Sequence, residues 1–294
     1  MIQLTDAEIE RLVSEDISSD KRIMDFLGIA GSPGEASVTV CSDTAVCGTE
    51  EAVSVFIRLG LDVKHYTPSG TFCNKGDQIL GVEGDIAAIC TGWRIAAKLM
   101  IYASGIAERT RRLVMAARSE VSEIMVVGSG NHPPVKTKLL QKALQSGGAM
   151  TRCAGMANTT VILQDHLTFM GGYERLHHIV ANLRRNQPKQ MVAVEVINPI
   201  DALVATRSGA HFIQASGMPP QLFGTVVHEC RKVAPWIGII ASGEISDADA
   251  PQYAAAGADV LETSWVYSAA PAEMAFHATP VNERALISEA NTLH

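Results

Sequence analysis

Met191-Val-Ala-Val-Glu-Val196 is an apolar run of the kind that forms a buried strand, and the same pattern recurs along the back half of the chain. From about Glu123 to Trp265, each run is followed by an amphipathic stretch of about ten to fifteen residues. The runs occupy residues 124–128, 160–163, 191–196, 211–216, 237–243 and 259–263. This alternation predicts a β/α barrel, in which functional residues lie where the strands end.

The composition is that of a globular protein. Of 294 residues, 47% are hydrophobic, 19% are charged and 5% are aromatic, which predicts a mostly aliphatic core. The length suffices for one barrel and a smaller second domain. The net charge is -7 and no run of basic residues occurs, so we expect a small-molecule substrate and no nucleic-acid partner.

We expect no export signal at the start of this sequence. Met1-Ile-Gln-Leu-Thr-Asp-Ala-Glu8 lacks the basic start and apolar centre of a signal peptide. We also expect no apolar span of about eighteen residues, and therefore no membrane partner. The six cysteines form no Cys-x-x-Cys pair, so reduced thiols are expected. Together these features predict a cytoplasmic protein.

The front third predicts an α+β domain. A helix begins near Thr5, and Glu8 stands three residues later, at the spacing of a capping box. Short strands are predicted at residues 35–41, 62–66 and 77–82, and a helix at residues 50–59.

A long helix connects this domain to the barrel. Its pattern covers residues 87–117 and is interrupted at Ser104-Gly105. Residues 272–278 are predicted to return as a strand to the first domain. The predicted domains are therefore residues 1–110, joined by residues 272–294, and residues 111–271, which form the barrel.

Several segments, taken in order, resemble one family. Trp93-Arg-Ile-Ala-Ala-Lys-Leu-Met-Ile-Tyr-Ala-Ser-Gly-Ile-Ala107, followed by Thr110-Arg-Arg-Leu-Val114, resembles the stretch that links the two domains of quinolinate phosphoribosyltransferases, and is most similar to the branch called ModD. Similar segments follow at Glu195-Val-Ile-Asn198, Ala241-Ser-Gly243, Thr263-Ser-Trp-Val-Tyr267 and Ala270-Pro-Ala272. The resemblance extends from Asp6 to about Ala278. It depends on the order and spacing of these segments and not on any single motif.

The resemblance implies a fold and a reaction. The fold is an N-terminal α+β sandwich with an incomplete, TIM-like β/α barrel of phosphoribosyltransferase type II, assembled as a homodimer or a higher homo-oligomer. The reaction is transfer of phosphoribose from phosphoribosyl pyrophosphate, with magnesium, to a nitrogen of a small aromatic acid. It requires cations near the diphosphate, backbone amides near the phosphate, and carboxylates near magnesium and the ribose cation.

The chain departs from the family at its cationic positions. The family has Thr-Arg-Lys-Thr and then Pro-Gly, whereas alignment on Pro134 gives Ser129-Gly-Asn-His132 and then Pro134-Val135. The family's His-Arg pair falls on Arg152 and Cys153, and its next strand-end lysine is Leu163. A slip of one or two residues in this alignment would return Arg152 to the family arginine.

The segments that bind the phosphate group in the family also differ in this chain. The family's Ser-Gly-Gly is Ser242-Gly243-Glu244, and the next strand ends in Glu262. Two carboxylates would face a dianion there, each with a repulsion of roughly 4 kcal/mol at about 4 Å and an effective dielectric constant of about 20. The family's Asp-Asn after the fourth strand is Ser216-Gly217, whereas Glu195 is retained.

Two hypotheses follow. The first is a phosphoribosyltransferase-family pentosyltransferase that acts on a small aromatic or anionic compound, with Glu195 as the catalytic carboxylate. Its candidate substrate-binding residues are Arg94, Asn131, His132, Lys136, Arg152, Ser242, Gly243, Glu244 and Ser264. The second is a catalytically altered family member that binds a metal or another small ligand at the barrel mouth. Its mixed histidine and carboxylate set is His132, Asp165, His166, Glu195, Glu244 and Glu262.

Overall fold

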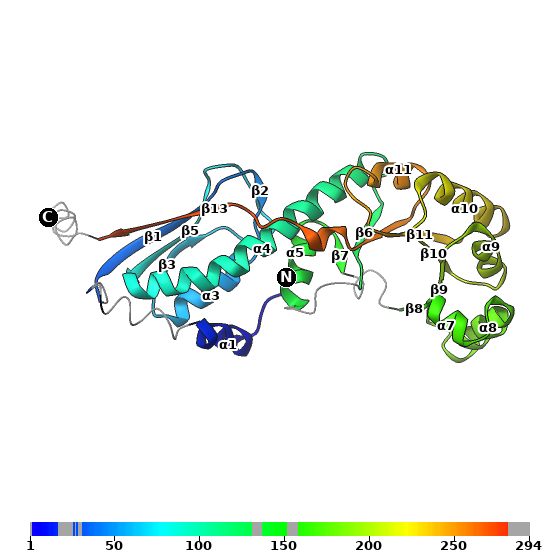
Figure 1. Ribbon diagram of the computed structural model, residues 1–294, viewed down its shortest axis with the longest axis horizontal. Helices are drawn as coiled ribbons and strands as arrows, with labels where there is room; N and C mark the ends of the chain where they lie inside the picture. The colour runs from blue at the N-terminus through cyan, green and yellow to red at the C-terminus, as the bar shows by residue number, and fades with distance from the viewer. Residues whose placement is uncertain are drawn as a thin grey trace. The chain divides into compact units, whose positions relative to one another are not determined.

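The computed structural model describes residues 2–16, 26, 28, 31–130, 137–151 and 158–281. Contacts between residues divide the chain into two compact units (Figure 1). The first unit consists of Met1–Arg109, Val135–Gly147 and Ala269–His294, and the second of Thr110–Pro134 and Gly148–Ser268. The first unit thus includes helix α5 (Thr137–Ser146), which lies within the stretch predicted as barrel.

The second unit contains a sheet of seven parallel strands in the order β7-β6-β12-β11-β10-β9-β8. The strands are β6 (Met125–Gly128), β7 (Met150–Thr151), β8 (Thr159–Ile162), β9 (Met191–Val196), β10 (Phe212–Ser216), β11 (Gly238–Gly243) and β12 (Val260–Thr263). Strands β7 and β8 lie at the two edges, so the barrel is incomplete. The six strands predicted from apolar runs are confirmed to within one residue at each end, whereas the two-residue β7 was missed.

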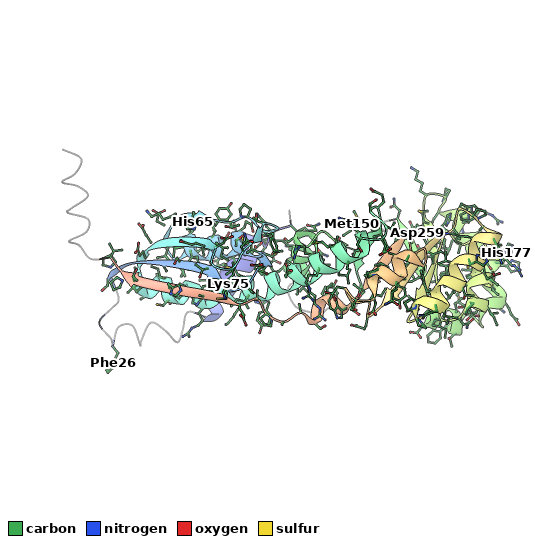
Figure 2. All side chains as sticks on the ribbon, turned by 90° about the horizontal axis from the view of Figure 1, so that it is seen from above. Phe26, His65, Lys75, Met150, His177 and Asp259 are labelled. Carbon is green, nitrogen blue, oxygen red and sulfur yellow. The ribbon has the colours of Figure 1, made fainter. Side chains whose placement is uncertain are left out.

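Helices follow most of these strands. They are α7 (Gln164–Phe169), η1 (Tyr173–Arg175), α8 (Leu176–Asn186), α9 (Pro199–Arg207), α10 (Pro220–Val233), α11 (Ala250–Ala255) and η2 (Trp265–Ser268). Asn198 begins α9, because its side chain accepts a hydrogen bond from the Asp201 amide at 2.9 Å. Asp259, labelled in Figure 2, fixes the start of β12 through bonds of 2.9 and 3.0 Å from Arg231 of α10.

The first unit is built on an antiparallel sheet in the order β13-β1-β5-β3. The strands are β1 (Pro33–Val40), β3 (Asp62–Tyr66), β5 (Gln78–Asp85) and β13 (Met274–Pro280), and β2 (Thr44–Ala45) pairs separately with β4 (Phe72–Cys73). Strand β13 pairs with β1, as predicted for the returning segment. One face of the sheet packs on α3 (Thr49–Arg58) and α4 (Ile86–Arg118), and there Trp93 stacks on Phe276 with ring centroids 4.7 Å apart.

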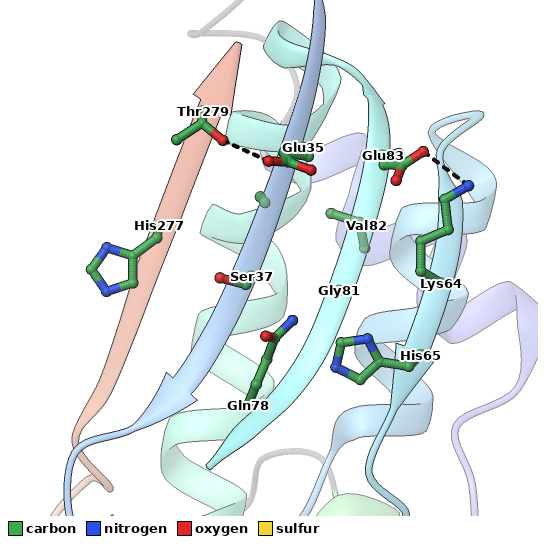
Figure 3. A pocket seen from close by; sticks show the side chains of 11 residues that line it. Glu35, Ser37, Lys64, His65, Gln78, Gly81, Val82, Glu83, His277 and Thr279 are labelled. Atoms are coloured by element: carbon green, nitrogen blue, oxygen red, sulfur yellow. Dashed lines mark hydrogen bonds and ion pairs between the residues drawn. The ribbon is translucent and has the colours of Figure 1, made fainter. Parts of the chain in front are cut away.

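The opposite face of this sheet is polar (Figure 3). A row of paired residues, His277, Ser37, Gly81 and His65, crosses its four strands. The His65 ring lies over Gly81, where a side chain would meet the ring at 2.6 Å. A shallow cavity of about 360 Å³ lies on this face. Such alternation of buried and polar positions is typical of an antiparallel sheet with one packed face.

The predicted capping box is present at the start of α1 (Asp6–Asp16). The Thr5 amide donates to Glu8 Oε2 at 2.7 Å, and the Glu8 amide donates to Thr5 Oγ1 at 3.4 Å. Hydrogen bonds from the Thr5 hydroxyl and amide, and from Lys138, lower the pKa of Glu8 to about 2. The exchange satisfies amides that the first turn of a helix would otherwise leave unpaired.

The predicted interruption of the long helix is wrong, because α4 runs without a break from Ile86 to Arg118. The buried Ser104 hydroxyl donates to the Cys47 carbonyl at 3.2 Å and accepts from the Cys47 amide at 2.9 Å. At Gly105, an added Cβ would clash with the carbonyl oxygen of Ala270. Ser104 and Gly105 are therefore small because other segments pack closely against them, and they do not end the helix.

Helix α4 also corrects the expectation that no apolar span is present. Among the described helices it alone is long and apolar enough to cross a membrane by length and composition. However, Ile89 and Met100 pack in one core cluster of the first unit, and Ile95 and Leu99 pack in another. These four residues of α4 are therefore buried within the first unit.

Substituting Gly105 by alanine is expected to destabilise the fold by about 1–3 kcal/mol, because the clash with Ala270 forces backbone to move. Gly224 in the middle of α10 is the matched control, since an added Cβ there meets only Ala256 Cβ at an ordinary 3.7 Å. Gly224→Ala should stabilise by about 0.5–1 kcal/mol through helix propensity. Urea unfolding of both variants tests this difference in sign, and equal effects would contradict it.

A buried ion cluster attaches α5 to α3. The Lys142 side chain is 0% exposed, and its Nζ bonds Glu50 Oε2 at 2.7 Å and Glu51 Oε2 at 2.6 Å. Glu50 also accepts bonds from the Ser69 amide, at 2.9 Å, and the Ser69 hydroxyl. Burial alone would raise the pKa of Glu50, but the bonds from Lys142 and Ser69 outweigh it and lower the pKa to about 2. Sequence patterning did not predict this cluster.

The depressed pKa of Glu50 predicts sensitivity to acid. Its folded pKa of about 2 lies below the ordinary 4.5, so its stabilisation is complete above about pH 4.5 and is lost as the pH falls through 2. The lost amount is about 3 kcal/mol. We expect the free energy of unfolding, measured in urea between pH 7 and pH 2, to fall less steeply for Glu50→Gln than for the wild type. Parallel curves would contradict the assignment.

Candidate functional site

The second unit has a cavity of about 300 Å³ at the carboxyl ends of its parallel strands. Apart from Gln214, the middle residue of β10, its lining residues are among the last two residues of a strand or the first three residues after one. They are Ser129, Gly130, Leu163, Gln164, Asp165, Glu195, Gln214, Ser216, Ser242, Gly243, Glu262 and Ser264. This is the position at which β/α barrels place their active sites.

Four of these residues form a continuous polar strip across neighbouring strands, which we call the floor strip: Glu195, Gln214, Ser242 and Glu262. Glu195 of β9 pairs in register with Gln214 of β10, and Ser242 of β11 pairs with Glu262 of β12. Gln214 Nε2 donates to Ser242 Oγ at 3.5 Å, and the Ser242 hydroxyl donates to Glu262 Oε2 at 3.3 Å. Hydrogen bonds therefore link Gln214 to Glu262 through Ser242, and Glu195 lies beside Gln214 by strand register.

The corner between β8 and α7 holds Glu195 in place. Glu195 Oε2 accepts a hydrogen bond from the Gln164 amide at 3.1 Å. The Gln164 side chain in turn donates to the Glu195 carbonyl at 2.7 Å and to the Tyr173 hydroxyl at 2.8 Å. Burial, more than any other cause, raises the pKa of Tyr173 to about 12, so this hydroxyl keeps its proton at neutral pH. The carboxylate is thus oriented by a neutral network.

A buried tyrosine stands beside the other end of the floor strip. The Tyr267 hydroxyl donates to the carbonyl of Ser129, the residue directly after β6, at 3.1 Å. Burial first, and then the negative charge of Glu262, raise the pKa of Tyr267 to about 12. Glu262 itself is only 1% exposed.

The structure brings four of the candidate residues together. Glu195, Ser242, Gly243 and Ser264 all line the cavity. Glu244 is exposed and is not among the lining residues, and its carboxylate accepts a hydrogen bond from the Ser264 hydroxyl.

The remaining candidates lie elsewhere. Arg94 is exposed on α4 in the first unit and is not among the described lining residues. Asn131, His132, Lys136 and Arg152 fall outside the described residues.

Sequence reasoning missed Gln214 and Gln164 as site residues. Gln214 is polar within an otherwise apolar run, and alternation along β10 turns it to the side opposite Ile213 and Ala215. That single polar residue was the available signal. Gln164 opens a helix after a strand end, which is too common a position to single it out.

The metal hypothesis gains no support from the described part of the chain. Among those residues, no group of three or more His, Cys, Asp or Glu side chains is arranged to hold an ion. Magnesium needs fewer protein ligands than a structural metal, because it generally takes one or two carboxylates and completes its shell with water and substrate phosphates. The cavity lining contains two carboxylates that could serve as such ligands, Glu195 and Asp165.

Family models match almost the whole chain. Residues 16–104 match the N-terminal domain of quinolinate phosphoribosyl transferase, and residues 106–275 match its C-terminal domain. A "Putative pyrophosphorylase ModD" from Rhodobacter capsulatus is 30% identical over 85% of this chain and 96% of its own length. A "Probable nicotinate-nucleotide pyrophosphorylase [carboxylating]" from Methanothermobacter thermautotrophicus is 23% identical over 89% of this chain and 94% of its own.

Solved structures agree on the fold. NadC from Streptococcus pyogenes covers 96% of this chain and 100% of its own with a TM-score of 0.82, at 19% identity. The nicotinate-nucleotide pyrophosphorylase from Ehrlichia chaffeensis covers 94% of this chain and 100% of its own with a TM-score of 0.83, at 15% identity. The two domain matches, in this order, and the relative at 30% identity decide the family: the chain belongs to the quinolinate phosphoribosyl transferase family.

Proposed function

We propose that this protein is a pentosyltransferase that moves a phosphoribosyl group from phosphoribosyl pyrophosphate to a nitrogen of a small aromatic or anionic compound. The observation that carries the proposal is Glu195, a carboxylate held by Gln164 on the floor of a cavity at the carboxyl ends of the barrel strands. The names of its relatives, which are pyrophosphorylases, support the same reaction class.

The cavity offers the groups that this transfer requires. The bond between ribose C1 and the pyrophosphate oxygen breaks, the bond from C1 to the receiving nitrogen forms, and positive charge develops on the ribose. The Glu195 carboxylate stabilises that charge, because electrostatic stabilisation is strongest where a charge is held in place before the reaction. The hydroxyls of Ser242 and Ser264 donate to Glu262 and Glu244, so they would have to turn from these carboxylates to bind phosphate oxygens. Gly130 and Gly243 let the ligand approach the backbone.

Magnesium is part of this proposal. When bound, it would neutralise negative charge on the diphosphate, and Glu195 with Asp165 would hold it. Arg94, Lys136 and Arg152 are retained as proposed contacts of the anion, and Asn131 and His132 as proposed substrate-binding residues. Glu244 is retained at the rim, where it orients Ser264.

We also propose a cytoplasmic homodimer or higher homo-oligomer that acts on a small molecule, without a nucleic-acid or membrane partner. The net charge of -7 argues against a phosphate backbone as partner. Helix α4 carries Arg94, Lys98 and Arg112 along its length and packs its apolar residues into core clusters, which argues against insertion in a membrane. Light scattering coupled to size exclusion measures the assembly, and a monomer would overturn that part.

Calorimetric titration with phosphoribosyl pyrophosphate tests the proposed reaction. With magnesium present, we expect saturable heat that neither ribose 5-phosphate nor pyrophosphate alone reproduces. Adding a receiving compound should then release pyrophosphate. Absence of binding at about 1 mM, which corresponds to a binding free energy weaker than about -4 kcal/mol, would overturn the proposal. The remaining reading would be a catalytically altered family member that binds another small ligand.

A further inference from the structure

Gln164 binds Glu195 at two points. Its backbone amide donates to Glu195 Oε2 at 3.1 Å, and its side-chain Nε2 donates to the Glu195 backbone carbonyl at 2.7 Å. Pairing between β8 and β9 ends at Ile162 and Val194, directly before Glu195. Gln164 therefore continues the contact with β9 past the end of β8, and it does so at the residue that carries the carboxylate.

The orientation of the Gln164 side-chain amide follows from its neighbours. Nε2 has two hydrogens, and its two acceptors are the Glu195 carbonyl and the Tyr173 hydroxyl oxygen, at 2.7 and 2.8 Å. The opposite orientation would place the amide oxygen against the Glu195 carbonyl, and both of these atoms are acceptors. Both N–H groups are therefore used within the protein, so this side chain has no donor left for a ligand.

Tyr173 holds the same amide from η1. Its hydroxyl accepts from Gln164 and directs its own hydrogen to the Glu195 carbonyl at 3.4 Å. Because burial, above all, raises the pKa of Tyr173 to about 12, the hydroxyl keeps this hydrogen at neutral pH. A closed set of hydrogen bonds thus joins η1, the start of α7 and the end of β9.

The Glu195 carboxylate depends on this support. The side chain is half-buried and lines the cavity. Within the described part of the chain, the Gln164 amide donates to Oε2, and Oε1 accepts from no residue. A flexible side chain that is held at one oxygen keeps its position only while the donor keeps its own.

We propose that Gln164 is a positioning residue of the transferase site, whose side chain fixes the start of α7 against the Glu195 backbone and so holds the amide that orients the Glu195 carboxylate. Tyr173 assists by fixing the Gln164 side chain. The effect on the reaction rests on the proposed function, whereas the effect on the position of Glu195 rests on the hydrogen bonds alone.

Gln164→Met should lower kcat by about 10- to 100-fold and change the KM for phosphoribosyl pyrophosphate by less than about twofold. Methionine has a similar volume and keeps the backbone amide, but it cannot donate to the Glu195 carbonyl. Tyr173→Phe removes one partner of the Gln164 amide and leaves the other, so we expect a smaller loss of about three- to tenfold. Gln221→Met is the matched control and should change kcat by less than about twofold, because Gln221 is exposed on α10 and is not among the described lining residues.

A double variant separates positioning from a direct role. If Gln164 acts through Glu195, its substitution has little left to disturb once the Glu195 charge is gone. Gln164→Met should therefore lower kcat by less than about threefold further in the Glu195→Gln background. A residue that contacts the substrate, or that only stabilises the fold, would keep its full effect there. Circular dichroism verifies that each variant is folded.

Three kinetic results would overturn the inference. One is a kcat of Gln164→Met within about twofold of the wild-type value. Another is a rise in KM with unchanged kcat, which would make Gln164 a substrate contact. The last is a double variant in which the two losses multiply.

Crystal structures of the wild type and of Gln164→Met test the position of Glu195 without any reaction. We expect the carboxylate in the variant to move by about 1 Å or more, or to occupy more than one conformer. A single conformer at the wild-type position would overturn the inference even if the donor titration succeeds. If that titration fails, the proposed function is wrong, and the two crystal structures decide whether Gln164 positions Glu195.

Discussion

Replacing Lys142 by methionine is expected to lower the free energy of unfolding by about 3–5 kcal/mol. The ammonium is fully buried between Glu50 and Glu51, and Glu51 is itself 2% exposed. Methionine fills a similar volume but leaves two carboxylates facing each other without a cation. Burial alone would lower the pKa of Lys142, yet the bonds from the two glutamates outweigh it and raise the pKa, so the side chain is charged at neutral pH.

Lys138 is the matched control, one turn earlier on the same helix. It pairs with Glu8 at 2.9 Å, but both side chains are 43% exposed, so water replaces the lost partner. Lys138→Met should therefore unfold at nearly the wild-type urea concentration. Equal losses for the two lysine variants would show that the buried cluster contributes no more than a surface pair.

A compensated variant separates the unpaired charges from lost packing. Adding Glu50→Gln and Glu51→Gln to Lys142→Met removes the charges that the single variant leaves unpaired. Replacing all members of a buried ion cluster by neutral groups is often close to neutral. We expect the triple variant to recover more than half of the stability that Lys142→Met loses. A further loss would indicate that methionine packs badly at this position.

The sequence predicted the barrel well because its signal is local and repeated. Parallel strands buried on both faces, such as β9 and β11, are continuous apolar runs, so their positions follow from composition alone. The capping box of α1 was predictable for the same reason, since Thr5 and Glu8 interact within one turn. Strand β7 was missed because two residues are too short to form a pattern.

The failures come from contacts between distant residues. Ser104 and Gly105 resemble a helix break in sequence, but Cys47 and Ala270 supply the reason for small residues there. Lys142 resembles a surface lysine on an amphipathic helix until α3 places two glutamates beside it.

The floor strip is a similar case. Gln214 is an isolated polar residue in the sequence. Only the sheet order pairs it with Glu195 of β9 and brings it within 3.5 Å of Ser242, two residues beyond its partner Ile240 on β11. Local patterning therefore predicts the elements and the strand ends, whereas the partners of each side chain depend on the sheet order.

Substituting Glu195 by glutamine is expected to reduce kcat of the proposed transfer by about 100–1,000-fold. The carboxylate faces the cavity, and the Gln164 amide fixes its position at 3.1 Å. Glutamine keeps an oxygen that can accept this hydrogen bond, so the geometry is retained while the negative charge is lost. If Glu195 stabilises charge that develops on the ribose, the loss appears in kcat, because the ground state carries little of that charge.

Glu174→Gln provides the matched control, because Glu174 is an exposed carboxylate on η1 that is not part of the cavity lining. It should change kcat by less than about twofold, as expected for a screened surface charge. Steady-state measurement of pyrophosphate release over a range of donor and magnesium concentrations separates kcat from KM. A rise in the KM for magnesium with unchanged kcat would assign Glu195 to holding the ion. Unchanged values of both would remove Glu195 from the site, because a half-buried charge that faces the reacting sugar cannot be neutralised without an effect on the rate.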